Sequence, residues 1–407
     1  MSAGLPLRAT ADVPSPAAAI AGVDMVNAYP AGAARVQPSE IDGPTRDLRL
    51  DACRGLALWF MFVDHIPHNI VSWLTLRNYG FSDATEVFVF VSGYTCMVAY
   101  GDVLRRRGWL AAMVHAVRRG CQIYIAFLVL LVAYLVLVEA LGGGAYLDAT
   151  NTAVFFEHPA TAIVRASMMQ YTPVNTDVLP IFVLFHLTFP ILLWLFARNT
   201  GIALTLSALL YLSVQIFGFN LPAWPRGEWF FNPLAWQMLF VFGMWAARTD
   251  SAKLWTWARS RAALILSILY LLFSLIVALS WQINALDGLL PGILSRLIYP
   301  IDKSHLDPLR FLHFLSLAVV AIHLTPRDRR AWSSPWTTGI VRCGENSLAI
   351  FCLSVLLSLL ASATLDATGS AIPMQIAVSL SGIAVMIAAA TLLTFASRLG
   401  GHGSRLF

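Results

Sequence analysis

Long apolar blocks recur along most of this 407-residue sequence, and they constrain its fold more than any other feature. A helix needs about 20 predominantly apolar residues to cross the hydrocarbon core of a bilayer, and several blocks approach or reach this length. Backbone polar groups inside lipid must bond within the chain, so apolar blocks of this length indicate helices. The sequence therefore predicts an all-α, polytopic membrane protein with the lipid bilayer as a partner.

The composition supports this prediction. The chain is 58% hydrophobic and 12% charged, whereas soluble domains carry about 25% charged residues. A soluble fold of this length cannot hide so much apolar surface. The formal net charge of +5 comes from basic residues that lie between the apolar blocks. This distribution is typical of the positive-inside rule rather than of nucleic-acid binding, so we expect no nucleic-acid partner.

We expect about ten membrane-spanning helices, two of them short for a full crossing. Their approximate ranges are 55–74, 86–100, 116–141, 178–197, 202–219, 233–247, 262–281, 309–324, 347–365 and 373–396. Arginine and lysine are frequent in alternate connections and sparse in the others, which predicts that both termini are cytoplasmic. No cysteine falls in a predicted outside loop, so we expect no disulfide framework.

Three parts of the chain differ in composition. Residues 1–45 are rich in Ala, Pro and Gly, and they lack the basic start and apolar core of a signal peptide. We expect a disordered cytoplasmic tail there. Residues 46–397 form the predicted membrane domain, and residues 398–407 form a short cytoplasmic tail.

Ionisable residues within the first predicted span are functional candidates, because charge is costly inside a membrane. Arg54 and His65 are eleven residues apart, so they share a helix face with an axial separation of about 16 Å. We expect His65 near the bilayer midplane, as a general base, a proton relay or a polar contact between helices. Asp64 points about a quarter-turn away from His65. No second ligand stands at metal-site spacing, so no metal site is expected.

The segment before the second span contains Asp83 and Glu86. Both carboxylates suit a helix N-terminus, where free N–H groups need acceptors. Capping accounts for Asp83, whereas Glu86 is also a candidate for the active site. Ser92 and Gly93 follow, and such small residues permit close helix packing.

A dense cationic patch lies between the second and third spans. It consists of Arg105, Arg106, Arg107, Arg118 and Arg119. Guanidinium groups bind phosphates well, so this patch is a candidate site for a nucleotide-like cofactor. The alternative is a role in setting topology and contacting anionic lipid.

The eighth span is preceded by a polar cluster suited to a hydroxyl-rich ligand. Its candidate residues are Asp302, Lys303, Arg310 and His313, and a solvated loop is the alternative. An aromatic segment at the outer end of the sixth span contains Trp229 and Trp236. Aromatic side chains form belts at membrane interfaces, and they also stack on sugars. Both interpretations of the two tryptophans stay open from the sequence alone.

At these residues the sequence resembles OpgC-type proteins, the succinyltransferases of osmoregulated periplasmic glucans. The resemblance extends over about residues 46–395. It is carried by segments 46–58, 64–65, 77–93, 229–237, 302–303, 309–313 and 344–348.

The wider superfamily of membrane acyltransferases has an arginine and a histidine on its first helix with ten residues between them, matched by Arg54 and His65. Its second helix begins with two aromatics, Ser and Gly, matched by Phe88, Phe90, Ser92 and Gly93. An arginine-rich segment precedes its third helix and is matched loosely by Arg118 and Arg119. The usual Arg-Ile-Pro is replaced here by residues 122–124, Gln-Ile-Tyr, which leaves the roles of these two arginines open.

The resemblance implies a multi-pass protein of the bacterial inner membrane that moves an acyl group, expected to be succinyl, from acyl-CoA to a glycan hydroxyl. Arg54 and the cationic patch would hold the donor's phosphates, and no permanently bound cofactor is implied. His65 would act as general base or carry the acyl group, with Asp64 or Glu86 orienting it. A proton-coupled transporter or flippase of a polar solute is the rival function, and a scaffold without chemistry is a third.

Overall fold

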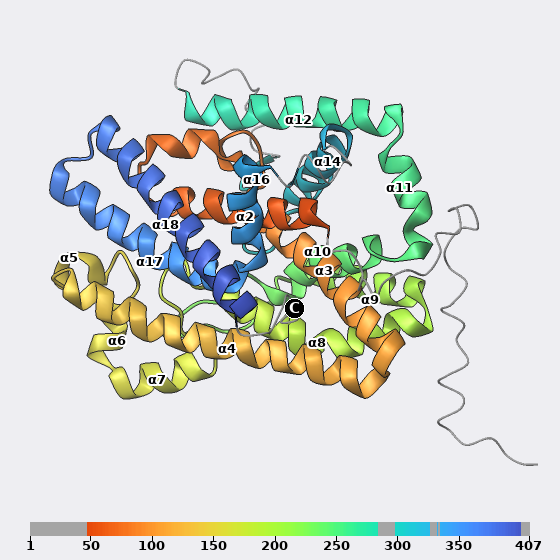
Figure 1. Cartoon of the computed structure of the whole chain (residues 1–407), viewed down its shortest axis with the longest axis horizontal. Coiled ribbons are helices and arrows are strands. Elements are labelled where there is room, and N and C mark those ends of the chain that lie inside the picture. Colours follow the sequence, from red (N-terminus) through yellow and green to blue (C-terminus); the bar gives the residue numbers. More distant parts are fainter. Residues whose placement is uncertain (1–46, 284–297, 326–331, 333, 400–407) are drawn as a thin grey trace, which may run out of the picture. The chain divides into compact units, whose positions relative to one another are not determined.

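The computed structural model describes residues 47–283, 298–325, 332 and 334–399 (Figure 1). These residues are largely helical, and an isolated β-bridge joins Pro222 and Glu228. The all-α prediction is therefore confirmed for the described part of the chain. The predicted tail of residues 1–45 lies outside it, as do residues 400–407.

Seven of the described helices are long and apolar enough to cross a membrane. They are α3 (Ala84–Arg107), α4 (Trp109–Ala140), α8 (Val178–Arg198), α9 (Thr200–Phe217), α12 (Arg261–Gln282), α17 (Ser347–Thr368) and α18 (Ile372–Leu399). Two shorter apolar helices are α10 (Pro233–Ala246) and α14 (Pro308–Leu324). With α2 (Leu48–Asp64), these helices coincide with or overlap the ten predicted spans. The count of ten crossings and the side of each terminus stay predictions.

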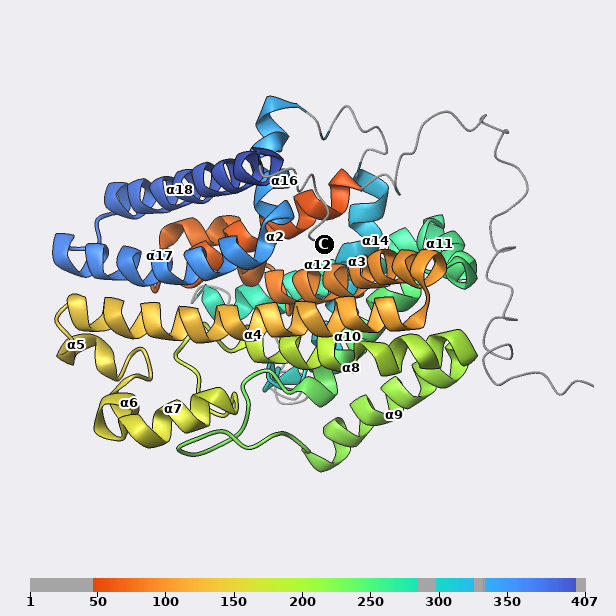
Figure 2. The ribbon, with the colours of Figure 1, turned by 60° about the horizontal axis from the view of Figure 1, so that its bottom comes forward.

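Short helices connect the long ones. They are α5 (Gly144–Leu147), α6 (Ala153–Glu157), α7 (Pro159–Ser167), α11 (Ala252–Ala258) and α16 (Pro335–Glu345). In Figure 2, α18, α17, α4 and α8 lie one beside the next, in agreement with their contacts. Helices α3 and α4 are separated only by Gly108, whose φ of 82° allows the sharp reversal.

Helix α2 differs from the predicted first span of residues 55–74. It begins at Leu48, where Asp47 caps it by accepting from the N–H of Arg49 at 3.0 Å. It ends at Asp64 because Pro67 has no N–H to continue the ladder, and His68 has a φ of 54°. The chain then forms two short 3₁₀ turns. His65 therefore lies at the end of the helix, and its predicted position within a longer span is wrong.

One face of α4 explains why this fold belongs in lipid. Ile125, Val129, Val132 and Val136 recur at helical spacing, and each is 59–64% exposed. A stripe of large exposed aliphatic side chains is a liability in water, whereas lipid tails cover it without cost. The apolar helices and this stripe identify a membrane protein.

Two pairs of glycines let helices in the bundle touch backbone to backbone. A Cβ on Gly93 of α3 would lie 2.0 Å from the carbonyl oxygen of Phe240 in α10. A Cβ on Gly243 of α10 would lie 2.2 Å from the carbonyl oxygen of Phe90. Gly55 of α2 and Gly344 of α16 approach each other's helix in the same way. These contacts confirm the packing interpretation of Gly93, and they fix α3, which carries part of the candidate site.

Replacing Gly93 with alanine is expected to destabilise the bundle by about 1–3 kcal/mol, because α3 and α10 must move apart to admit the methyl group. The measurement is thermal unfolding of the purified protein in detergent. Gly144→Ala is the matched control, since a Cβ there meets nothing within 4 Å. Equal melting temperatures for the two variants would contradict the close contact.

Candidate functional site

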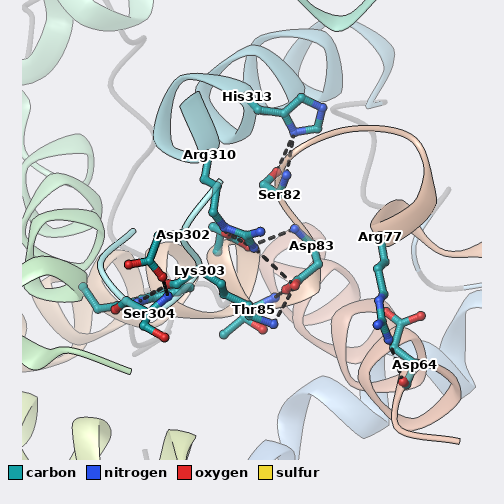
Figure 3. Close-up of polar contacts among 12 residues, drawn as sticks. Asp64, Arg77, Ser82, Asp83, Thr85, Asp302, Lys303, Ser304, Arg310 and His313 are labelled. Atoms are coloured by element: carbon teal, nitrogen blue, oxygen red, sulfur yellow. Dashed lines mark hydrogen bonds and ion pairs between the residues drawn. The ribbon is translucent and has the colours of Figure 1, made fainter. Parts of the chain in front are cut away.

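The loop that leaves α2 holds Asp64 in place. The hydroxyl of Thr75 donates to its Oδ1 at 2.7 Å, and Arg77 donates to its backbone carbonyl at 3.0 Å. Figure 3 shows Asp64 and Arg77 together, apart from the other polar residues drawn. Because Asp64 is engaged by its own loop, its carboxylate is a part of that loop's structure.

His65 is half-buried at the end of α2. Its Nδ1 is buried and has no hydrogen-bond partner in the described part of the chain. Lys303, Asp83 and Arg77 are close enough to act on the imidazole electrostatically. A buried polar atom normally has a partner, so this nitrogen is a candidate for a substrate contact, as are Nε2 of His305 and Nε2 of His313, which also lack one among the described residues. This is the feature that most favours chemistry at this end of α2.

Three buried charged side chains and the half-buried Lys303 form an ion cluster next to His65. We use the name ion cluster for Asp83, Glu86, Lys303 and Arg310. Arg310 Nη2 lies 2.6 Å from Glu86 Oε1 and 3.3 Å from Asp83 Oδ2, and Lys303 Nζ lies 2.6 Å from the same Asp83 oxygen. Figure 3 shows Lys303 and Arg310 converging on Asp83. The cluster joins the start of α3 to the start of α14, more than 200 residues later in the sequence.

Local structure explains why the two carboxylates are there. Asp83 caps α3 by accepting from the N–H of Thr85 at 2.8 Å, and Glu86 accepts from the N–H of Asp83 at 2.9 Å. This is a capping box, which satisfies two N–H groups at the helix start. The capping prediction for Asp83 is confirmed. Each carboxylate therefore serves the helix end and the ion cluster together.

The charge state of Asp83 is fixed by its neighbours. Burial alone would raise the pKa of its carboxyl, but the positive charges of Lys303 and Arg310 outweigh this effect. Hydrogen bonds from Lys303 and from the N–H of Thr85 act in the same direction. The pKa of Asp83 is held well below its ordinary value, so the group stays ionised at physiological pH.

His313 is on α14, beside the ion cluster, and packs against the loop that precedes α3. Its Nδ1 meets the N–H of Ser82 at 3.2 Å and the hydroxyl of Ser82 at 2.7 Å. A Cβ on Gly80 would lie 1.9 Å from His313 Nε2, so only glycine allows the ring this position. The bond from Ser82 to His313 is drawn in Figure 3. His313 therefore supports the loop that presents Asp83.

Asp302 and Trp236 lie next to Lys303 of the ion cluster. Asp302 accepts from the N–H of Ser304 at 2.7 Å and pairs with His305, so it holds its own turn. The indole of Trp236 is fully buried and donates to the carbonyl oxygen of Lys303 at 3.1 Å. Trp229, in contrast, lines a cavity between the segments that precede α8 and α10. Of the two tryptophans, Trp236 thus positions the backbone at Lys303.

The arginines predicted to bind a donor lie in the middle of α2, at the end of α3 that is opposite Asp83, and in the first half of α4. Arg54 bonds to the hydroxyl of Ser347 in α17, and its guanidinium lies 5.7 Å from the centre of the Phe88 ring. The side chains of the cationic patch are exposed except for Arg119, which is half-buried and bonds to Gln122 at 3.3 Å. Asp102 pairs with two members of the patch, Arg105 and Arg106.

The structure thus brings Glu86, Lys303 and Arg310 together, with His65 and His313 beside them. Arg54 and the cationic patch are not members of this ion cluster. The sequence did not predict that Asp83 would pair with both Lys303 and Arg310, because its spacing from Glu86 indicates only a helix cap. The sequence also did not predict the importance of Ser82 and Gly80, which depends on the contact with His313. Among the described residues, no group of three or more His, Cys, Asp or Glu side chains is suited to a metal ion.

Long apolar helices around an ion cluster define a polytopic helical membrane protein with a polar site at one end of its first, second and eighth predicted spans. A family model described as "OpgC protein" matches residues 46–398. The match covers most of the chain, so the chain belongs to the OpgC family, which confirms the resemblance drawn from its motifs. The family implies a membrane-associated acyltransferase with a role like that of the glucan succinyltransferases. Neither the curated proteins nor the solved structures contain a match.

Proposed function

We propose that this protein moves a succinyl group from cytoplasmic succinyl-CoA to a hydroxyl of a periplasmic glucan. Membership of the OpgC family supports the reaction class. The single structural observation that supports the site is the buried Nδ1 of His65, which is without a partner among the described residues and lies next to the ion cluster. An imidazole placed in this way is suited to proton transfer in acyl transfer.

In the proposed reaction, His65 takes the proton of the sugar hydroxyl as the oxygen attacks the thioester carbonyl. A C–O bond forms to the acyl carbon, and the C–S bond to coenzyme A breaks. The proton on the imidazolium then passes to the departing thiolate, which leaves as free coenzyme A. A neutral imidazole is the form that can take this proton, and burial together with the positive charges of Lys303 and Arg77 favours that form over the imidazolium.

Other residues of the site have supporting roles in this proposal. Arg54 and the cationic patch contact the phosphates of the donor, because guanidinium groups are strong phosphate partners. Lys303 retains 31% exposure of its side chain, whereas Arg310 retains 10%. Lys303 is therefore the cation of the ion cluster that can contact a substrate. Glu86 and Arg310 keep the start of α3 against the start of α14.

Inside-out membrane vesicles that contain this protein are expected to transfer label from succinyl-CoA to a glucan enclosed in their lumen. The donor carries its radiolabel on the succinyl carbons, and the product is measured as label that stays with the glucan after gel filtration. Vesicles without the protein are the control. Label that enters the lumen without joining the glucan would support a transporter and contradict the proposal.

A further inference from the structure

A cavity of about 300 Å³ lies beside the ion cluster. Most of its lining comes from the segment between α7 and α8 and from the segment between α9 and α10. Small-molecule sites occupy about 300–1,000 Å³, so this cavity suits a single compact unit rather than a large ligand. The cavity is a built feature, because Trp224 in one wall donates its backbone N–H to the carbonyl oxygen of Gln170 in the other at 2.8 Å.

Aromatic rings form much of the lining. They belong to Trp224, Trp229, Phe230 and Phe231. Trp229 is 9% exposed and Phe230 is 49% exposed, so the aromatic lining extends from the interior to the surface. Ring faces of this kind stack on the apolar C–H faces of a sugar, whose other edges carry hydroxyl groups.

Polar side chains complete the cavity with hydrogen-bonding groups. Asp177 lines it, and Oδ1 of Asp177 accepts from the hydroxyl of Thr172 at 2.5 Å. Burial raises the pKa of Asp177 to about 6, which the bond from Thr172 partly opposes. Asp177 is thus largely a carboxylate at neutral pH, able to accept from hydroxyl groups. Glu228 and Arg226 also line the cavity, so its acidic side chains outnumber its basic ones and favour a neutral ligand over an anion.

One pair of side chains connects the cavity to the ion cluster. Phe231 belongs to the lining, and Nζ of Lys303 lies 5.5 Å from the centre of its ring. The same Nζ lies 2.6 Å from Asp83. A ligand in the cavity is therefore separated from the ion cluster by the Phe231 ring and Lys303. Lys303 is also close enough to His65 to act on its imidazole electrostatically, which relates the cavity to the proposed chemistry.

We infer that this cavity binds one unmodified, neutral sugar unit of the acceptor glycan, adjacent to the unit that receives the acyl group. The inference rests on the proposed function for the identity of the acceptor. It assigns to Asp177 and to the aromatic wall the recognition of the glycan, separate from the chemistry at His65.

The inference is tested by titrating a glucose trisaccharide into the purified, donor-free protein and measuring its binding by calorimetry. Asp177→Asn and Phe230→Ala are each expected to weaken binding at least about tenfold, because each removes a main contact to the sugar. Phe219→Ala is the matched control. Phe219 lies in the same connection and is 55% exposed, but it does not line the cavity.

The outcomes separate this inference from the proposed function. Loss of binding in both cavity variants, with normal binding in the control, supports the inference whether or not acyl transfer is detected. Wild-type binding that both cavity variants retain would overturn the inference, while label transfer in vesicles would still support the proposed function. Absence of trisaccharide binding to the wild-type protein would also overturn it.

Discussion

Replacing His65 with alanine is expected to lower the rate of acyl transfer to glucan by at least about 100-fold, since a positioned general base contributes about 10²–10⁴-fold to a rate. The reason is local. Nδ1 of His65 is buried without a partner among the described residues. Nε2 of His313 also has none there, but it is packed against Gly80, and Nδ1 of His313 is occupied by Ser82. The rate is measured as labelled glucan formed per amount of protein in membranes.

The control for this experiment is His68→Asn. His68 is exposed in the same loop, and its φ of 54° is one that asparagine tolerates. This variant is expected to transfer acyl groups at the wild-type rate. If His65→Ala at an equal protein level were as active as His68→Asn, the imidazole would have no part in the chemistry and the proposed mechanism would fall.

The positions of the long helices follow from the sequence because lipid imposes a simple requirement on it. Blocks such as 116–141 and 373–396 have the length and apolarity that only a helix satisfies in a bilayer, and α4 and α18 lie there. The end of α2 was misplaced for a physical reason. Apolar residues recur after Asp64, at Ile66 and from Ile70 to Leu74, but Pro67 interrupts the helix and residues 70–74 form a 3₁₀ turn.

The candidate site was predicted in pieces, because its residues are joined only by the fold. Glu86 and Arg310 were both candidates, but they are 224 residues apart and no local pattern pairs them. The capping role predicted for Asp83 is correct, but a cap gives no indication of its bonds to Lys303 and Arg310. Trp236 was a candidate for stacking on a sugar, yet its buried indole donates a hydrogen bond to the backbone carbonyl of Lys303. Local spacing thus predicts caps and faces, whereas ion pairs between distant helices require the structure.

Replacing Arg310 with methionine is expected to lower the free energy of unfolding by about 3–5 kcal/mol, because it breaks a buried ion pair and leaves the other partner unpaired. Glu86 is fully buried and would lose its cation, and Asp83 would retain only Lys303. The measurement is thermal unfolding of the purified protein in detergent. Because Arg310 was also predicted to bind substrate, a stability readout separates the two roles.

Arg106→Met provides the matched comparison, since Arg106 also pairs with an aspartate, Asp102, but its side chain is 57% exposed. An exposed pair of this kind contributes less than about 1 kcal/mol, so this variant should melt close to the wild-type protein. Adding Glu86→Gln to Arg310→Met should restore part of the lost stability, because it removes the unpaired buried charge. Should Arg310→Met melt like Arg106→Met, the ion cluster would not hold α3 to α14. The guanidinium of Arg310 would then be free to serve a substrate.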